Sequence, residues 1–233
     1  MKRLESFRSY LESLCQPSVS CGIDIFGSIK NGFGTKNSDV DLCLHLNPAS
    51  VSTQRVNIQF HCPDDLKVTC HFHYLTVSNE VAMFNTKLLE VYGKLDSRVP
   101  QLGVALKVWA KCCNISGASE GWLSSYAYII MLIHFLQSTE KPVLPFLQQV
   151  SFLTIVWLSP NSQTVAELWL DFFMYYAWVF DFENEVVQIR HPKKLTKKRK
   201  GWEASPLAME DPFVLSHNLA ATVDAEGILS FSR

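Results

Sequence analysis

Apolar and polar residues in the first part of the chain follow helical and then strand-like patterns. Apolar residues three or four positions apart predict an amphipathic helix over 3–15. Cys21–Phe26 is a short apolar run that ends at a Gly-Ser pair, and Asp39–Leu46 alternates strictly, so both segments are predicted as strands. Between them, Lys30–Asn37 contains two glycines and is predicted as a short helix or loop.

Helical spacing dominates the rest of the chain. Helices are predicted over Glu80–Tyr92, Pro100–Cys113, Ser124–Gln137 and Val165–Phe180, with Glu185–Ile189 as a short strand. The helix after residue 124 is apolar almost all round, which predicts burial, and the helix after residue 165 is predicted to be largely buried too. Pro100 occupies a plausible first helical position.

This order of elements indicates an α+β first third followed by a mainly helical region. The 233 residues suit one large domain or two small domains around a shared cleft. We predict an α+β domain over 17–95 and a helical domain over 96–233, with the helix in 1–16 joined to them. The sequence contains no internal repeat that would suggest a solenoid.

Composition excludes several classes of protein. With 48% hydrophobic and 18% charged residues, the chain is too apolar for a disordered protein. The formal net charge of −1 gives no bulk attraction to nucleic acid or membranes, so such binding requires a local patch. No apolar run reaches the roughly 20 residues of a membrane span, and the N-terminal residues have no apolar stretch typical of a secretory signal, so neither a secretory signal nor a membrane partner is expected.

One cluster of cysteine and histidine residues suggests a metal site, formed by His61, Cys62, Cys70, His71 and His73. Its spacing fits no common zinc pattern. Lys67–Tyr74 also alternates like a strand, so a structural strand is preferred and a small zinc protein is the weaker alternative.

Two aspartates carry the clearest chemical signal. On a strand, Asp39 and Asp41 point to the same face, while Val40, Leu42 and Leu44 point to the other face, into a core. Two neighbouring carboxylates repel each other unless cations neutralise them, and Mg²⁺ suits carboxylate and phosphate oxygens.

The Gly27-Ser28 pair supplies the complementary signal. A strand that ends in Gly-Ser before a helical turn offers backbone N–H groups and a hydroxyl to an anion. A phosphate-binding turn about a dozen residues before a metal-binding pair of aspartates indicates nucleoside triphosphate chemistry.

The combined pattern resembles the signature of DNA polymerase β-like nucleotidyltransferases. FGSIKNGFGTKNSDVDLCL, LKVWAKCCNISGASEGWLSSYAYIIMLIHFLQ and MEDPFVLSHNLAATV are similar to terminal uridylyltransferases and non-canonical poly(A) polymerases, especially the cytoplasmic zinc-knuckle uridylyltransferases. The resemblance implies a polymerase β-like α+β nucleotidyltransferase domain packed on a helical poly(A)-polymerase-associated domain. It also implies transfer of UMP from UTP to RNA 3′ ends with Mg²⁺ or Mn²⁺, in the cytoplasm or the nucleus.

The same resemblance implies a role for each matching residue. Gly27 and Ser28 would hold the triphosphate, and the catalytic Asp39 and Asp41 would hold the metals. The other nucleotide contacts would come from Asn79 to the ribose, Lys107, Lys111 and Ser125 to phosphates, Tyr126 to the base by stacking, and Asp211 and His217 in the base-recognition loop. A histidine in that loop is associated with a preference for UTP over ATP. Lys107 and Lys111 are also four positions apart on a predicted helix, so they share a face.

The sequence departs from the family pattern at two positions, the first of which favours a second interpretation and the second of which weakens uracil recognition. Tyr74 occupies the position of a third aspartate, and Val214 replaces an acidic residue of the base-recognition loop. Tyrosine is neutral near pH 7 and cannot replace a carboxylate as a metal ligand or base. The alternative is therefore an inactive nucleotidyltransferase that binds RNA or protein. No particular protein partner is implied.

A basic run near residue 200 has three interpretations. It could steer RNA through its phosphates, form a solvated loop, or act as a localisation signal. Its members are Lys193, Lys194, Lys197, Lys198, Arg199 and Lys200.

Overall fold

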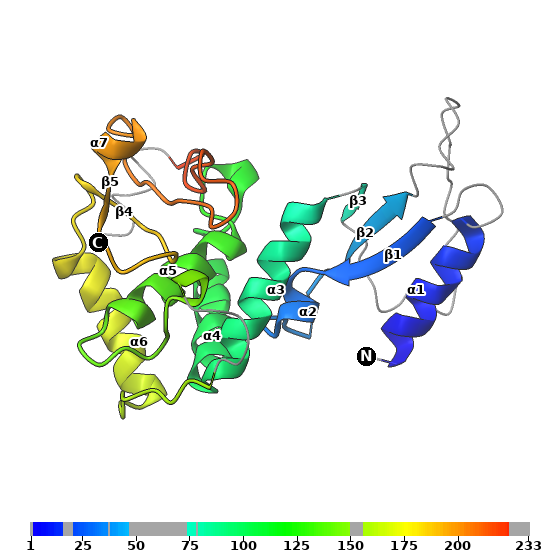
Figure 1. Cartoon of the computed structure of the whole chain (residues 1–233), viewed down its shortest axis with the longest axis horizontal. Coiled ribbons are helices and arrows are strands. Elements are labelled where there is room, and N and C mark those ends of the chain that lie inside the picture. Colours follow the sequence, from blue (N-terminus) through cyan, green and yellow to red (C-terminus); the bar gives the residue numbers. More distant parts are fainter. Residues whose placement is uncertain are drawn as a thin grey trace. The chain divides into compact units, whose positions relative to one another are not determined.

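The chain divides into two compact units, an N-terminal unit, Met1–Glu90, and a C-terminal unit, Val91–Arg233 (Figure 1). The structure is a computed structural model that describes residues 2–15, 21–36, 38–46, 74–77, 79–149 and 156–223. Among these residues, none of the helices has both the length and the apolar character that a membrane crossing requires.

The N-terminal unit contains a three-stranded mixed sheet with helices. Its elements are α1 (Lys2–Cys15), β1 (Cys21–Phe26), α2 (Ser28–Asn31), β2 (Asp41–Leu46), β3 (Tyr74–Val77) and α3 (Glu80–Leu95), the last of which continues into the C-terminal unit. The strand order is β1-β2-β3, with β1 and β2 antiparallel and β2 and β3 parallel. The central strand β2 therefore begins with Asp41, the second aspartate of the Asp-Val-Asp segment.

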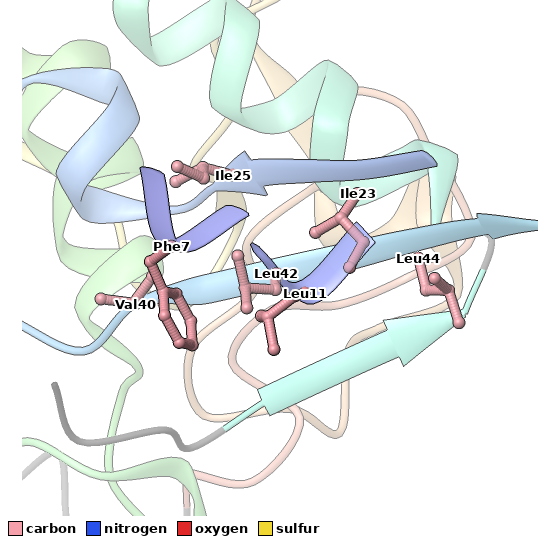
Figure 2. Close-up of a cluster of buried hydrophobic side chains, with 7 residues drawn as sticks. All are labelled: Phe7, Leu11, Ile23, Ile25, Val40, Leu42 and Leu44. Carbon is pink, nitrogen blue, oxygen red and sulfur yellow. The ribbon is translucent and has the colours of Figure 1, made fainter. Parts of the chain in front are cut away.

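Helix α1 packs on one face of this sheet (Figure 2). The buried cluster joins apolar side chains of the helix to alternate residues of the strands and the segment before β2: Phe7, Leu11, Ile23, Ile25, Val40, Leu42 and Leu44. Burying each such side chain contributes about 1.5–3 kcal/mol. Because side chains alternate across a strand, this core directs the residues between them to the opposite face.

The C-terminal unit is mainly helical. Its elements are α4 (Arg98–Cys112), η2 (Ala118–Glu120), α5 (Ser125–Ser138), η3 (Leu147–Gln149), α6 (Val165–Met174), η4 (Tyr175–Val179), β4 (Glu185–Val186), β5 (Leu195–Thr196) and α7 (Lys197–Lys200). Helix α5 starts at a cap in which the Ser124 hydroxyl accepts a hydrogen bond from the N–H of Ala127 at 3.2 Å. Every residue from Ala127 to Ile133 is buried, which confirms the predicted burial of this helix.

Several boundaries differ from the prediction. Strand β2 begins at Asp41, so Asp39 lies before it, and α4 begins at Arg98, which makes Pro100 its third residue. The prediction that Val165–Phe180 is one largely buried helix is wrong. The α-helix ends at Met174 and continues as a π-helical turn, and Leu170 and Trp178 are 63% and 83% exposed.

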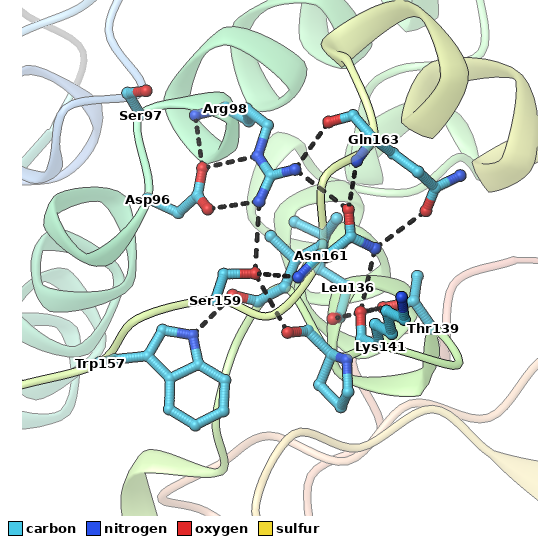
Figure 3. Close-up of polar contacts among 12 residues, drawn as sticks. Asp96, Ser97, Arg98, Leu136, Thr139, Lys141, Trp157, Ser159, Asn161 and Gln163 are labelled. Carbon is cyan, nitrogen blue, oxygen red and sulfur yellow. Dashed lines mark hydrogen bonds and ion pairs between the residues drawn. The ribbon is translucent and has the colours of Figure 1, made fainter.

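A polar network ties the start of α4 to the segment before α6 (Figure 3). Arg98 donates from Nη2 to Asp96 Oδ2 at 2.6 Å, from Nη1 to Asn161 Oδ1 at 3.0 Å and from Nη1 to the Gln163 carbonyl at 2.7 Å. Burial of Asp96 raises its pKa, but the hydrogen bonds and charge of Arg98 outweigh burial, so the net pKa is lowered. The pair therefore stabilises the fold at neutral pH, and this stabilisation is lost as the pH falls through the lowered pKa of Asp96.

Arg98→Ala is expected to lower the stability of the C-terminal unit by about 3 kcal/mol, because it leaves a mostly buried carboxylate without its cation. All six tryptophans lie in this unit, so denaturant unfolding followed by tryptophan fluorescence measures its stability selectively. Arg199, an exposed arginine of the same unit, is the control, and Arg199→Ala is expected to change stability by less than about 0.5 kcal/mol. Equal losses for the two variants would contradict this role of Arg98.

Candidate functional site

A sharp bend at Gly27 joins β1 to α2. Gly27 has φ 72° and ψ −155°, a conformation that L side chains rarely adopt. Its carbonyl accepts from the N–H groups of Lys30 and Asn31, both at 3.1 Å, which starts the short helix. Its own N–H donates to Thr86 Oγ1 of α3 at 3.0 Å. The N–H groups of Gly27, Lys30 and Asn31 are thus already engaged, so a phosphate would be bound by the Ser28 hydroxyl and by the N–H groups of Ser28 and Ile29.

The sheet register brings Asp41 to this bend. Phe26, the last residue of β1, pairs with Asp41, the first residue of β2. A Cβ atom placed on Gly27 would lie 1.9 Å from Asp41 Oδ2 and 2.8 Å from its Cγ. The carboxylate therefore rests directly against the glycine backbone, and only glycine leaves room for it.

Asp39 lies two residues earlier, before the strand. Val40, between the two aspartates, is 3% exposed and packs in the α1 core together with Leu42, so the alternation along β2 directs Asp41 away from that core. Mg²⁺ is commonly held by one or two carboxylates together with substrate phosphates, and this donor pair fits that requirement. Within the described ranges, no group of three or more His, Cys, Asp or Glu residues is arranged to hold a metal.

The third carboxylate position of the family falls at the start of β3. Tyr74 pairs with Asp41 in the parallel β2–β3 register, so its backbone lies beside the aspartate. The predicted zinc ligands His61, Cys62, Cys70, His71 and His73 lie outside the described residues, as does the predicted strand Lys67–Tyr74 apart from its last residue.

Asn79 lies at the start of α3 and is held on the same sheet face. Its N–H donates to the sulfur of Cys43 at 3.4 Å, and Cys43 lies two residues after Asp41 on β2. Its Oδ1 caps α3 by accepting from the N–H of Ala82 at 3.1 Å. Because Asn79 Oδ1 is used in this cap, the side-chain nitrogen of Asn79 is the atom that would contact a ribose.

In the C-terminal unit, the predicted residues on α4 and α5 are at least partly accessible. Lys107 is half-buried and Lys111 exposed on α4, and Ser125 is exposed at the first position of α5. Tyr126 is half-buried, and its hydroxyl is buried without a hydrogen-bond partner among the described residues. Burial, and then the negative charge of Asp211, raise the pKa of Tyr126, so it remains neutral.

The predicted base-recognition loop surrounds a buried aspartate. Asp211 is 3% exposed, and its Oδ1 accepts from the N–H groups of Phe213 at 2.8 Å and Val214 at 2.9 Å. Its Oδ2 lies 3.9 Å from Nδ1 of His217, whose side chain is 57% exposed. Asp211 therefore shapes the turn, and His217 is the accessible member of the pair.

The interpretation of the basic run as a solvated loop is wrong for its second half. Lys197–Lys200 form α7 after the short strand β5, and Lys197 is buried, with Nζ donating to the carbonyls of Ser205 at 2.5 Å and Pro206 at 3.0 Å. Burial lowers the pKa of Lys197. Lys194 pairs with Glu185, and Lys200 pairs with Glu210. Half of the run is thus engaged in structural contacts.

Sequence reasoning missed two buried polar residues next to the predicted site. Thr86 holds the Gly27 N–H and is 6% exposed, and Glu210, adjacent to Asp211, is 3% exposed. A signal existed for Thr86, because it lies three residues before the buried Leu89 and therefore on the apolar stripe of α3. Glu210 has no comparable signal, since its partners are 20 and 10 residues away in sequence.

A pocket of about 250 Å³ elsewhere in the C-terminal unit contains none of the predicted site residues. Its lining includes His134, whose Nδ1 bonds to the Gln188 carbonyl at 2.7 Å and whose Nε2 bonds to the Tyr175 hydroxyl at 3.1 Å. Burial lowers the pKa of His134. Both ring nitrogens of His134 are therefore used in hydrogen bonds within the protein, which indicates a structural role for this residue.

Comparisons with known proteins match both ends of the chain. The family model for the Cid1 family poly A polymerase matches residues 164–217, and the model for the central palm domain of mitochondrial-like poly(A) RNA polymerase matches residues 1–63. Human terminal uridylyltransferase 7 is 33% identical over 93% of this chain. Poly(A) RNA polymerase cid13 of Schizosaccharomyces pombe is 29% identical over 96% of it.

Solved structures agree over nearly the whole length. Cid1 in complex with the UTP analogue UMPNPP has a TM-score of 0.81 and 30% identity, covering 99% of this chain and 82% of Cid1. The chain belongs to the terminal uridylyltransferase and non-canonical poly(A) polymerase family. A second structure, Cid1 poly(U) polymerase with bound MgGTP, has a TM-score of 0.85 and 29% identity over 99% of this chain and 84% of that one.

Membership of this family confirms the predicted α+β nucleotidyltransferase fold with its mixed sheet. The chain spans only part of its curated relatives, 18% of human terminal uridylyltransferase 7 and 47% of cid13. The activity, substrates and partners of this chain are therefore given below as proposals.

Proposed function

We propose that this chain is an RNA 3′-terminal nucleotidyltransferase that transfers UMP from UTP. The RNA 3′-hydroxyl oxygen would attack the α-phosphorus of UTP, forming a phosphodiester bond while the bond to the departing pyrophosphate breaks. The hydroxyl proton would leave to solvent. The single observation that carries the proposal is the contact between Asp41 and the Gly27 bend, which places a carboxylate beside the phosphate-binding turn.

In the N-terminal unit, each residue would act through the geometry described above. The Ser28 hydroxyl and the N–H groups of Ser28 and Ile29 would bind the triphosphate, and the amide nitrogen of Asn79 would donate to the ribose. Asp39 and Asp41 would hold Mg²⁺, which when bound neutralises charge on the triphosphate. Mn²⁺ would bind the same oxygen ligands.

In the C-terminal unit, Lys107, Lys111 and Ser125 would bind phosphates. Tyr126 would stack on the base, a contact typically worth about 1–3 kcal/mol. Asp211 would fix the loop, so that the exposed His217 imidazole would contact uracil and favour UTP over ATP. Support comes from the accessibility of His217 and from the Cid1 complex with a UTP analogue.

A second function is favoured by one observation, the pairing of Tyr74 with Asp41. A chain without a third carboxylate there would retain nucleotide or RNA binding but transfer nothing, and would serve as a binding module. Phenol ionises only near pH 10, so Tyr74 would not accept the proton of the attacking hydroxyl at neutral pH.

One assay separates the two functions. The purified chain is incubated with end-labelled RNA, Mg²⁺ or Mn²⁺, and each nucleoside triphosphate in turn. Extension with UTP that exceeds extension with ATP supports the uridylyltransferase. Retained binding of RNA and Mg²⁺-UTP without extension by any nucleotide would overturn it in favour of the binding module.

Tyr74→Asp is expected to raise the rate of RNA extension at least about tenfold, because a positioned carboxylate base typically contributes 10²–10⁴-fold. The rate of the first UMP addition under saturating UTP is the measurement. Tyr74→Phe is the matched control, since it keeps the ring without supplying a carboxylate, and it is expected to leave the rate unchanged. An equal rate for all three proteins would show that β3 contributes no group to the reaction.

A further inference from the structure

The loop that carries Asp211 and His217 lacks regular secondary structure to hold it. Its backbone is joined to its surroundings by isolated bridges, Val187 with Met209 and Glu210 with Asn218. Its tip exposes three apolar side chains, Phe213, Val214 and Leu215, at 38%, 36% and 40%. Residues 207–212 are buried and the Gln148 side chain donates to the Pro212 carbonyl at 3.0 Å, whereas residues 213–217 are exposed. Side-chain anchors therefore matter most for keeping this tip in one conformation.

Glu210 provides a buried anchor at the base of this loop. The residue is 3% exposed, and its two carboxylate oxygens have different cationic partners. Oε2 lies 3.1 Å from Nη1 of Arg190, and Oε1 lies 2.8 Å from Nζ of Lys200. Each charge-assisted bond helps to offset the cost of burying the carboxylate.

Lys200 extends this anchor to the tip of the loop. The same Nζ that contacts Glu210 also donates to the carbonyl oxygen of Leu215, five residues further along the chain. It lies 4.6 Å from the centre of the Trp202 ring, which favours a cation. A single ammonium group thus connects the base of the loop with its tip, two residues before His217.

We propose that Lys200 is a positioning residue that holds the base-recognition loop in place and thereby sets the orientation of His217. Its effect on base selectivity rests on the function proposed above, whereas its effect on loop order does not. The proposal also divides the basic run by function. Lys200 is a tie within the protein, while Lys198, two residues earlier on α7, is exposed.

The test compares Lys200→Met, Lys200→Arg and Lys198→Met in the full chain. Hydrogen exchange of the amides of Phe213, Val214 and His217 is measured without nucleotide. Affinities for Mg²⁺-UTP and Mg²⁺-ATP are measured by calorimetry. Lys200→Met is expected to accelerate the exchange and to reduce the ratio of UTP to ATP affinity, each by about tenfold, the usual effect of losing a hydrogen bond to a charged group. Lys200→Arg keeps the charge and is expected to restore most of both.

Lys198→Met removes a charge from the same helix without touching the loop, and it is expected to leave exchange and the affinity ratio unchanged. Equal effects of Lys198→Met and Lys200→Met, or unchanged exchange in Lys200→Met, would overturn the positioning role. Tryptophan fluorescence confirms that each variant is folded, and Glu210 keeps Arg190 as a partner in all of them. A wild-type chain that binds neither nucleotide would contradict the proposed function, while exchange would still decide the role of Lys200.

Discussion

Asp41→Asn is expected to reduce UMP transfer by at least about a thousandfold, since metal-assisted charge stabilisation is worth several kcal/mol. Asparagine keeps the size of the side chain, so the contact with the Gly27 bend is preserved while the negative charge is removed. Single-turnover extension of labelled RNA gives the rate. Calorimetry with UTP, in the presence and absence of Mg²⁺, measures how much of the nucleotide affinity depends on the cation.

The matched control is Asp24→Asn. Asp24 lies on β1, pairs with Cys43 in the sheet register, and has a side chain that is 58% exposed and 3.1 Å from Nε2 of His45. Neutralising this second carboxylate of the same sheet is expected to change the rate by no more than about twofold. If Asp24→Asn and Asp41→Asn lose activity alike, general electrostatics rather than the Asp41 site would account for the loss.

Gly27→Ala is the second change with a large expected effect, a loss of transfer of at least about a hundredfold, the scale of a 1 Å misplacement of reacting groups. The new Cβ would lie 1.9 Å from Asp41 Oδ2, so the Asp41 carboxylate cannot keep its position against the bend. The carboxylate must move away from the bend, or the bend must open. Rates of extension and Mg²⁺-UTP affinity are both expected to fall.

Gly32→Ala is the control for backbone strain around α2. Gly32 also has a positive φ, 89°, but a Cβ there would meet no atom within 4 Å. Alanine in this left-handed helical conformation costs about 1–2 kcal/mol, whereas the φ 72°, ψ −155° conformation of Gly27 is open almost only to glycine, so Gly27→Ala combines strain with the clash. Gly32→Ala is expected to lower stability while retaining most of the transfer rate. A comparable loss of rate in both variants would mean that strain around α2, and not the Asp41 contact, disables the site.

The elements that the sequence predicted well are those whose signal is local. The strand Cys21–Phe26 and the helix after Ser124 were predicted within a residue of their observed bounds, because an apolar run that ends at Gly-Ser and a continuously apolar helical stretch are read from neighbouring positions. The helix over 165–180 was predicted as buried because its composition is apolar. Its exposed Leu170 and Trp178 show that composition does not determine which side of a helix is covered.

The candidate site divides in the same way. Gly27-Ser28 and Asp39-Val40-Asp41 were recognisable from residue type and spacing, and the sheet register then placed Asp41 against the bend. The position of Thr86 on the apolar stripe of α3 indicates burial, but its contact with the Gly27 N–H joins residues 59 positions apart and is not visible in the sequence. The structure of the basic run was not predicted. A lysine whose ammonium group is buried against backbone carbonyls looks the same in the sequence as a solvated lysine.

By itself the sequence determined the order of strands and helices, the family and the residue types available for nucleotide chemistry, because periodicity and motifs depend on neighbours along the chain. Only the tertiary structure decided which polar groups are already engaged. The Gly27 N–H donates to the Thr86 hydroxyl, and the Asp211 carboxylate accepts from the N–H of Phe213 in its own loop. The Lys200 ammonium donates to both the Glu210 carboxylate and the Leu215 carbonyl. Such engagements depend on distances between remote segments, and those distances exist only once the core has packed.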